Sequence, residues 1–106
     1  MQESDLINLK VLLPFGVFAE KHDVLKVVAD TNMGSFGILP HRLDCVAALT
    51  PGILFYQSQS EGDVYIAVDQ GILVKVGPSV LISVSNAIAG KDLSQLKEAV
   101  ANQFLN

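Results

Sequence analysis

The sequence Gly34-Ser35-Phe36-Gly37-Ile38-Leu39-Pro40 is followed, eleven residues after its proline, by the pair Pro51-Gly52. This spacing predicts tight glycine turns that flank a short apolar strand ending at Pro40. A second apolar strand at residues 46–49 then ends at the Pro-Gly turn. Glycine allows backbone angles that other residues avoid, and proline cannot continue a central strand. The stretch therefore predicts short strands joined by tight turns, and it contains no cluster of catalytic side chains.

The rest of the chain repeats this pattern of short apolar runs between turn residues. At residues 80–84, Val80, Ile82 and Val84 alternate with other side chains, as in a strand with one buried face. Further strands are expected at residues 6–13, 24–30, 53–57, 64–69 and 72–76. We expect residues 53–57 and 64–68 to pair as a hairpin. Evenly spaced short strands of this kind are typical of an all-β sandwich or barrel.

The pattern changes once, after Gly90. Asp92 is suited to cap a helix, and apolar residues then recur at helical spacing at Leu93, Leu96, Val100 and Phe104. We therefore expect residues 1–90 to form a β-sandwich domain and residues 91–106 to form the start of a C-terminal helical segment, truncated or short. An isolated helix of about four turns is marginal in water, so its apolar stripe needs a partner.

Composition and charge argue against several classes of protein. Half of the 106 residues are hydrophobic and 17% are charged, which is enough apolar material for a core. The net charge is −4 and the seven Lys and Arg are scattered, so a nucleic-acid partner is not expected. The longest apolar runs fall well short of the roughly 20 residues that a membrane-spanning helix needs, so direct membrane insertion is not expected either.

Candidate catalytic and ligand-binding residues are few. Ser35, His41 and Asp44 could form a hydrolytic triad only if they converged beside an oxyanion donor, and no Gly-x-Ser-x-Gly motif is present. His22 and His41 are not spaced like a metal site, and Cys45 is interpreted as a small buried hydrophobic residue. We therefore expect no enzymatic activity, no cofactor and no metal.

From about residue 6 to residue 92 the chain resembles the epsilon subunit of rotary F-type ATP synthases. Residues 34–52 match a Gly-x-x-Gly-Ile-x-Pro segment that leads through a histidine-containing loop to a Pro-Gly turn, and residues 9–18, 69–76 and 80–93 match other strands of that family. The resemblance implies a β-sandwich of about ten strands, followed by a helical hairpin of which only the start is present here.

The resemblance also implies a function without bond chemistry. Such a subunit is a non-catalytic part of the central stalk, and it couples the gamma subunit to the membrane c ring during ATP synthesis driven by an ion gradient. The turn facing the ring would contain Gly34, Ser35 and Phe36. The residues near gamma would be His41, Arg42, Leu43 and Ala47. The complex would lie on the cytoplasmic face of the bacterial inner membrane.

Two departures from the family pattern narrow these expectations. Pro40-His41-Arg42 stands where the family reads Pro-Gly-His, which indicates a divergent branch. Ser94, Lys97 and Glu98 replace the residues through which some relatives bind ATP, so we expect little or no ATP binding. The alternative interpretation is a generic β-sandwich module that binds a ligand or a protein. That module would need a concave apolar pocket, whereas a rotor subunit would show flat edge surfaces.

Overall fold

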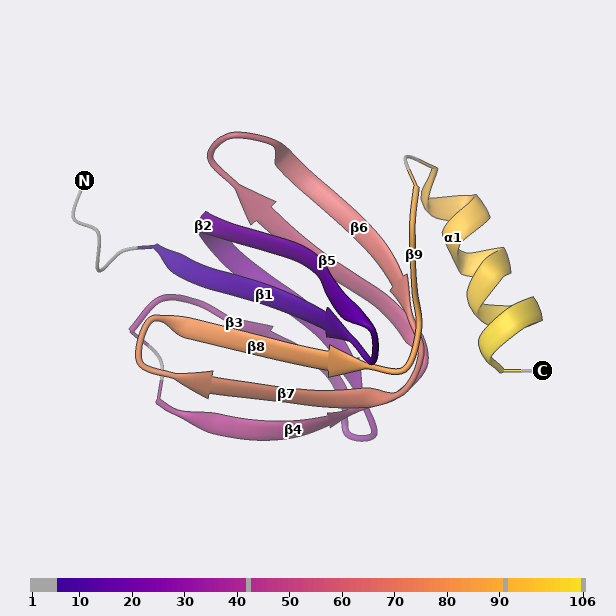
Figure 1. Cartoon of the computed structure of the whole chain (residues 1–106), viewed down its shortest axis with the longest axis horizontal. Helices are drawn as coiled ribbons and strands as arrows, with labels where there is room; N and C mark the ends of the chain where they lie inside the picture. The colour runs from indigo at the N-terminus through magenta and orange to yellow at the C-terminus, as the bar shows by residue number, and fades with distance from the viewer. Residues whose placement is uncertain (1–5, 42, 91, 106) are drawn as a thin grey trace.

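The computed structural model describes residues 6–41, 43–90 and 92–105 (Figure 1). This part of the chain contains nine strands, followed by an α-helix and a π-helical turn. In chain order the elements are β1 (Ile7–Leu13), β2 (Gly16–Thr31), β3 (Gly34–Ile38), β4 (Cys45–Leu49), β5 (Gly52–Ser58), β6 (Gly62–Val68), β7 (Gly71–Val76), β8 (Ser79–Val84), β9 (Ala87–Ala89), α1 (Leu93–Ala99) and η2 (Val100–Phe104).

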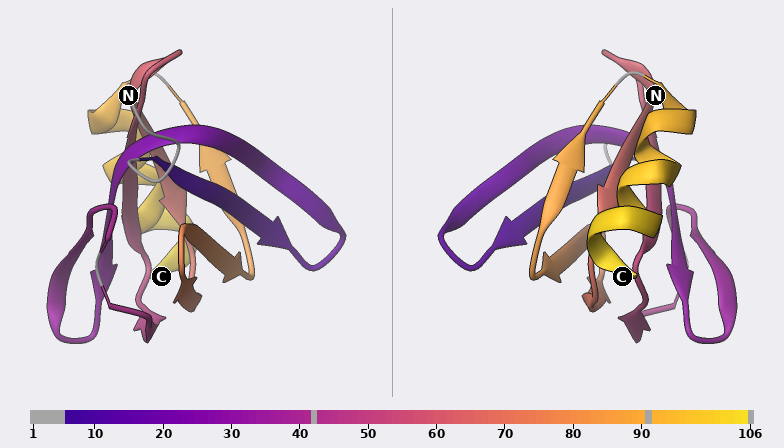
Figure 2. Two further views of the ribbon diagram at one scale, coloured as in Figure 1. Left: turned by 90° about the vertical axis from the view of Figure 1, so that its left-hand side faces the viewer. Right: turned by 90° about the vertical axis from the view of Figure 1, so that its right-hand side faces the viewer.

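The longest strand, β2, bends and belongs to both layers of the sandwich. Its first half pairs antiparallel with β1, and its second half pairs with β3 and β5. Register shifts at the bend, between Val24 and Lys26 on the β5 side, let the strand change direction without a turn. One layer is thus β4-β7-β8-β1 with the start of β2, and the other is β3-β2-β5-β6-β9. Figure 2 shows β2 arching from one layer to the other.

The two layers bury one common core. Ile7, Leu9 and Val11 face inward from β1 and are at most 1% exposed. On β8, Val80, Ile82 and Val84 are buried while the residues between them are exposed, which confirms the predicted alternation. The hairpin of β5 and β6 also forms as predicted, with Ile53 opposite Ala67. Burial of these apolar side chains is the main force that holds the layers together.

Two details differ from the expectations drawn from the sequence. The first is the strand expected at residues 24–30, because residues 16–31 form one continuous strand; with it the described residues contain nine strands, in agreement with a sandwich of about ten. His22 and Asp23, which directly precede the strand expected at residues 24–30, therefore lie within β2. The second is the turn at residues 34–37, which is strand β3 instead. The turn comes directly before β3, at residues 32–33. There the Thr31 hydroxyl accepts a hydrogen bond from the Met33 amide and donates one to the Gly34 carbonyl oxygen.

The C-terminal helical segment covers the outer face of the second layer (Figure 1). The carboxylate of Asp92 accepts a hydrogen bond from the Ser94 amide at 2.9 Å, which confirms the predicted cap. Leu96 and Val100 are buried with Ala67 in a small apolar cluster of their own. The predicted apolar stripe therefore has its partner within the chain. Among the described residues, no helix has the length and apolar character that crossing a membrane requires.

Candidate functional site

Most of the residues expected to contact partners lie at the two ends of β3, and Ala47 lies on β4. Gly34, Ser35 and Phe36 begin this strand, directly after a turn whose Met33 side chain is 90% exposed. His41 and Leu43 follow its other end, in the loop at the left of Figure 1. Arg42 lies outside the described residues. The structure thus separates Ser35 from His41 by the length of β3, so the hydrolytic triad considered above does not form.

The first end of β3 is fixed by Asp30 on the neighbouring strand. One oxygen of the Asp30 carboxylate accepts a hydrogen bond from the Ser35 hydroxyl at 3.2 Å, and the other accepts one from the Ile53 amide at 3.2 Å. The Ser35 hydroxyl is exposed and is engaged with Asp30 on the neighbouring strand. This end presents the apolar side chains of Met33 and the half-exposed Phe36 to solvent, as a protein contact would.

The loop after β3 is fixed to the turn between β7 and β8. The Asp44 carboxylate accepts a hydrogen bond from the Gly77 amide at 2.8 Å. His41 has a left-handed backbone with φ of 68°, which is uncommon for a residue other than glycine. Leu43 is 90% exposed. The loop thus holds a large apolar side chain out in solvent, beside the β7–β8 turn.

An apolar surface that the sequence did not single out lies next to this loop. Across the first layer, Val46 on β4 pairs with Val74 on β7, which pairs with Leu81 on β8. Four exposed residues on this outward face form what we call the outer apolar strip: Val46, Ile72, Val76 and Leu81. The sequence signal for this surface lies in β7, whose side chains are apolar on both faces of the strand except for one lysine.

The candidate residue Ala47 does not belong to this strip. It lies in β4 opposite Leu73 and is half-buried, on the inward side of the strand. Its neighbour Val46 is 72% exposed on the outward side. Because α1 and η2 cover the other layer, no described helix packs on the strip.

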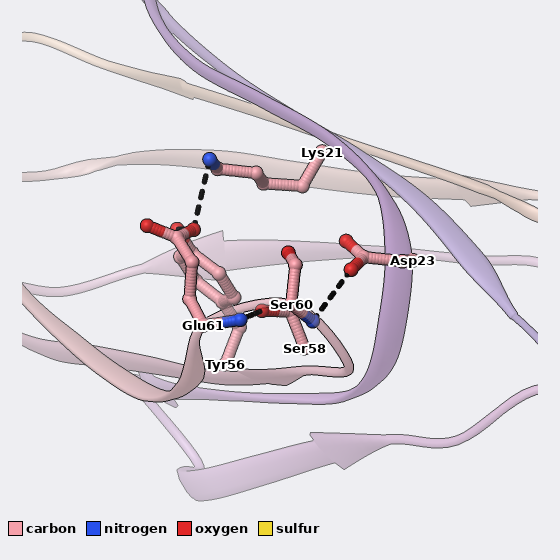
Figure 3. Close-up of polar contacts among 6 residues, drawn as sticks. All are labelled: Lys21, Asp23, Tyr56, Ser58, Ser60 and Glu61. Atoms are coloured by element: carbon pink, nitrogen blue, oxygen red, sulfur yellow. Dashed lines mark hydrogen bonds and ion pairs between the residues drawn. The ribbon is translucent and has the colours of Figure 1, made fainter.

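A polar cluster joins the β5–β6 loop to the bend of β2 (Figure 3). The Ser60 amide donates to the Asp23 carboxylate at 2.8 Å, and the Lys21 ammonium pairs with Glu61 at 2.8 Å. The hydrogen bonds from Ser60 lower the pKa of Asp23, and the hydrogen bond to Glu61 raises the pKa of Lys21. Burial raises the pKa of Tyr56, whose hydroxyl points to Glu61 at 3.5 Å. Because these groups bond to one another, the cluster fits a structural contact between the loop and β2 better than a reactive site.

One open cleft lies on the outer face of β1, β2 and β8. It has a volume of about 350 Å³, and charged or polar side chains, including Lys10, Glu20 and His22, form much of its wall. A small-molecule site buries most of its ligand's surface, whereas this cleft is open to solvent, so it does not favour the alternative interpretation. In the part of the chain that the structure describes, no three His, Cys, Asp or Glu residues gather as a metal site would require.

Residues 6–90 match the family described as ATP synthase, Delta/Epsilon chain, beta-sandwich domain. The chain belongs to this family. The "ATP synthase epsilon chain 2" of Paraburkholderia xenovorans (strain LB400) is 29% identical to this epsilon-family subunit over 98 residues, which cover 92% of this chain and 70% of that one. The "ATP synthase epsilon chain" of Staphylococcus haemolyticus (strain JCSC1435) is 30% identical over 97 residues, covering 92% and 72%.

Solved structures of ATP synthases contain the same fold. A chain of the Euglena gracilis mitochondrial enzyme, solved with OSCP, F1 and c-ring, superposes with a TM-score of 0.76 at 21% identity. A chain of the Tetrahymena thermophila central stalk and c-ring superposes with a TM-score of 0.68 at 20% identity. The superposition on the Euglena chain includes 90% of this subunit but only 61% of that chain. The superposition on the Tetrahymena chain includes 78% of this subunit and 66% of that chain.

These comparisons confirm the family, the β-sandwich fold and the class of function predicted from the sequence. The epsilon-family subunit is a non-catalytic component of the rotor stalk, within a membrane-associated ATP synthase. A subunit of this class needs exposed contact surfaces rather than a reactive centre.

Proposed function

We propose that this subunit joins the gamma subunit to the c ring of an F-type ATP synthase, so that torque passes between them during ion-driven ATP synthesis. The observation that carries the proposal is the placement of two exposed contact regions on one closely packed sandwich, at opposite ends of β3. Close packing makes such a body hard to deform, and a stiff connector transmits rotation without loss.

The gamma-facing region comprises the loop with His41, Arg42 and Leu43 together with the outer apolar strip. Surface patches of apolar side chains mark protein contacts when they are contiguous. Val46 at 72% exposure and Ile72 at 51% belong to such a patch. The hydrogen bond from Gly77 to Asp44 joins the loop to the strip, so the two form one continuous docking face. Ala47 is half-buried and lies behind that face.

The ring-facing region comprises Met33 and the first residues of β3, Gly34, Ser35 and Phe36. Both solved chains with this fold come from assemblies described with a c-ring, which supports a contact of this kind. The curated relatives are bacterial proteins. This origin supports a position on the cytoplasmic face of the bacterial inner membrane.

A binding titration against the gamma subunit of the same organism tests the proposal. The wild-type subunit is expected to bind gamma one to one. Val46→Glu places a charge on the outer apolar strip, and Arg42→Glu reverses the charge of the residue proposed to face gamma; each is expected to weaken binding roughly tenfold or more. Leu105→Glu adds the same charge at an exposed position after the helix and is the matched control, expected to bind like the wild type.

Each outcome has a distinct meaning. If the wild type does not bind correctly folded gamma, the proposed function is wrong. If it binds and neither charged variant weakens binding, the function stands and gamma docks on another face.

A further inference from the structure

A lysine is buried inside the sandwich at the end nearest the proposed gamma face. Lys75 on β7 is 2% exposed, and it faces the same interior as Leu73, which is 0% exposed. Its strand partners are Cys45 on β4 and Val80 on β8. Burying an ammonium group costs free energy unless the group finds hydrogen-bond acceptors. The Lys75 ammonium donates to the Gly77 carbonyl oxygen at 2.8 Å.

Gly77 connects this buried charge to the surface loop. Its carbonyl oxygen accepts from Lys75, and its amide donates to the Asp44 carboxylate at 2.8 Å. The glycine has a φ of 56°, in the left-handed region where other residues are strained. The next residue is held as well, because the Pro78 carbonyl oxygen accepts from the Asn8 amide at 2.8 Å. The turn therefore has a fixed position between the core and the loop.

The stability of the fold gives little reason for a charge at this position. An apolar side chain of similar volume in place of a buried charge is often neutral or stabilising. The benefit of Lys75 must then lie in what it positions. Asp44 adjoins Leu43, the 90% exposed side chain of the loop, and precedes Val46 of the outer apolar strip by two residues.

We propose that Lys75 is a positioning residue for gamma docking, which fixes the loop at Leu43 through the Gly77 turn and Asp44. This inference rests on the proposed function. A loop that is ordered before binding loses less conformational freedom on docking, and that difference appears as affinity.

The test compares Lys75→Met with the wild type by three measurements: affinity for gamma, melting temperature, and amide hydrogen exchange of residues 43–46 and 77. Lys75→Met is expected to lower gamma affinity roughly three- to tenfold, to leave the melting temperature unchanged or higher, and to speed exchange in the loop and the turn. Lys97→Met removes one exposed positive charge from α1 and is the matched control for net charge, expected to bind like the wild type.

Asp44→Ala breaks the same link at its other end, by removing the acceptor of the Gly77 amide. Asp44 is exposed, so this substitution leaves the core intact. It is expected to lower affinity by a similar factor, while Asp44→Asn keeps an oxygen acceptor and retains binding. If Lys75 and Asp44 act as one link, the double variant loses little more than the weaker-binding single variant. If Lys75→Met proves unable to fold, the Asp44 pair and its loop exchange decide the question.

The outcomes separate this inference from the function on which it rests. If the wild type binds gamma and Lys75→Met binds equally well, Lys75 has no positioning role. Fully additive losses from the two sites would also overturn the link. If the wild type itself fails to bind gamma, the proposed function falls, and the docking role of Lys75 falls with it.

Discussion

At the scale of single residues, we expect the carboxylate of Asp23 to make the stability of the fold depend on pH in the acid range. Hydrogen bonds from Ser60 lower its pKa below the ordinary value of 3.8. A carboxyl whose pKa is lower in the folded state stabilises the fold at pH values above its unfolded pKa. That stability is lost as the pH falls through the folded pKa. Asp23→Asn is therefore expected to lower the melting temperature near neutral pH.

The difference between wild type and Asp23→Asn should shrink below about pH 4 and vanish once the carboxyl is protonated. Melting curves recorded at intervals from neutral to acidic pH measure this difference directly. A difference that stays constant across the whole range would show that the Asp23–Ser60 contact stabilises the fold through shape and not through charge.

At the scale of strands, β7 and β8 approach each other so closely at Gly71 that no side chain fits there. A Cβ atom at Gly71 would collide with the Ser83 carbonyl oxygen and lie 2.7 Å from a methyl group of Val84. Gly71→Ala is therefore expected to lower the free energy of unfolding by about 1–3 kcal/mol, as overpacking of a core does. Gly37→Ala on β3 is the matched control, because a Cβ there would have no neighbour within 4 Å.

Denaturant unfolding of both alanine variants measures the contrast, with Gly37→Ala expected within about 1 kcal/mol of the wild type. Equal losses in the two variants would mean that strand flexibility, and not the close approach at Gly71, makes glycine necessary.

The elements that the sequence predicted correctly are those specified by local patterns. The alternation on β8, the hairpin of β5 and β6 and the Asp92 cap each depend on neighbouring residues. The continuity of β2 could not be predicted in this way, because its bend is set by pairing with β1 on one side and with β3 and β5 on the other. The same holds for Gly34: glycine is common in turns, but the place of Gly34 in β3 is set by its pairing with Thr31.

At the scale of the whole molecule, the candidate contact surfaces depend on which side of each strand faces outward. The sequence indicated Ala47, and the structure presents Val46 instead. A shift of one residue moves a side chain to the opposite face of a strand, and β4 is apolar at every position, so its pattern could not choose between the faces. The outer apolar strip became visible only when β4, β7 and β8 were placed side by side.

A connector with two separate contact regions can lose one contact while it keeps the other. Met33→Asp adds a charge at the turn before β3, at the proposed ring-facing end, and Ile72→Glu adds one in the outer apolar strip. In a reconstituted synthase, we expect Met33→Asp to reduce ion pumping per ATP hydrolysed while gamma affinity stays at the wild-type value. Ile72→Glu should lower both, because a subunit detached from gamma transmits no torque to the ring.

The contrast between the two variants depends on the 90% exposure of Met33 and the 51% exposure of Ile72, since neither substitution disturbs the core. Gamma affinity is measured by titration with the isolated subunit, and pumping is measured by ion uptake into vesicles at a matched rate of hydrolysis. If both variants reduced gamma affinity to the same extent, the two regions would belong to one interface, and the connector would have to hold the ring through a surface other than the end of β3 that bears Met33.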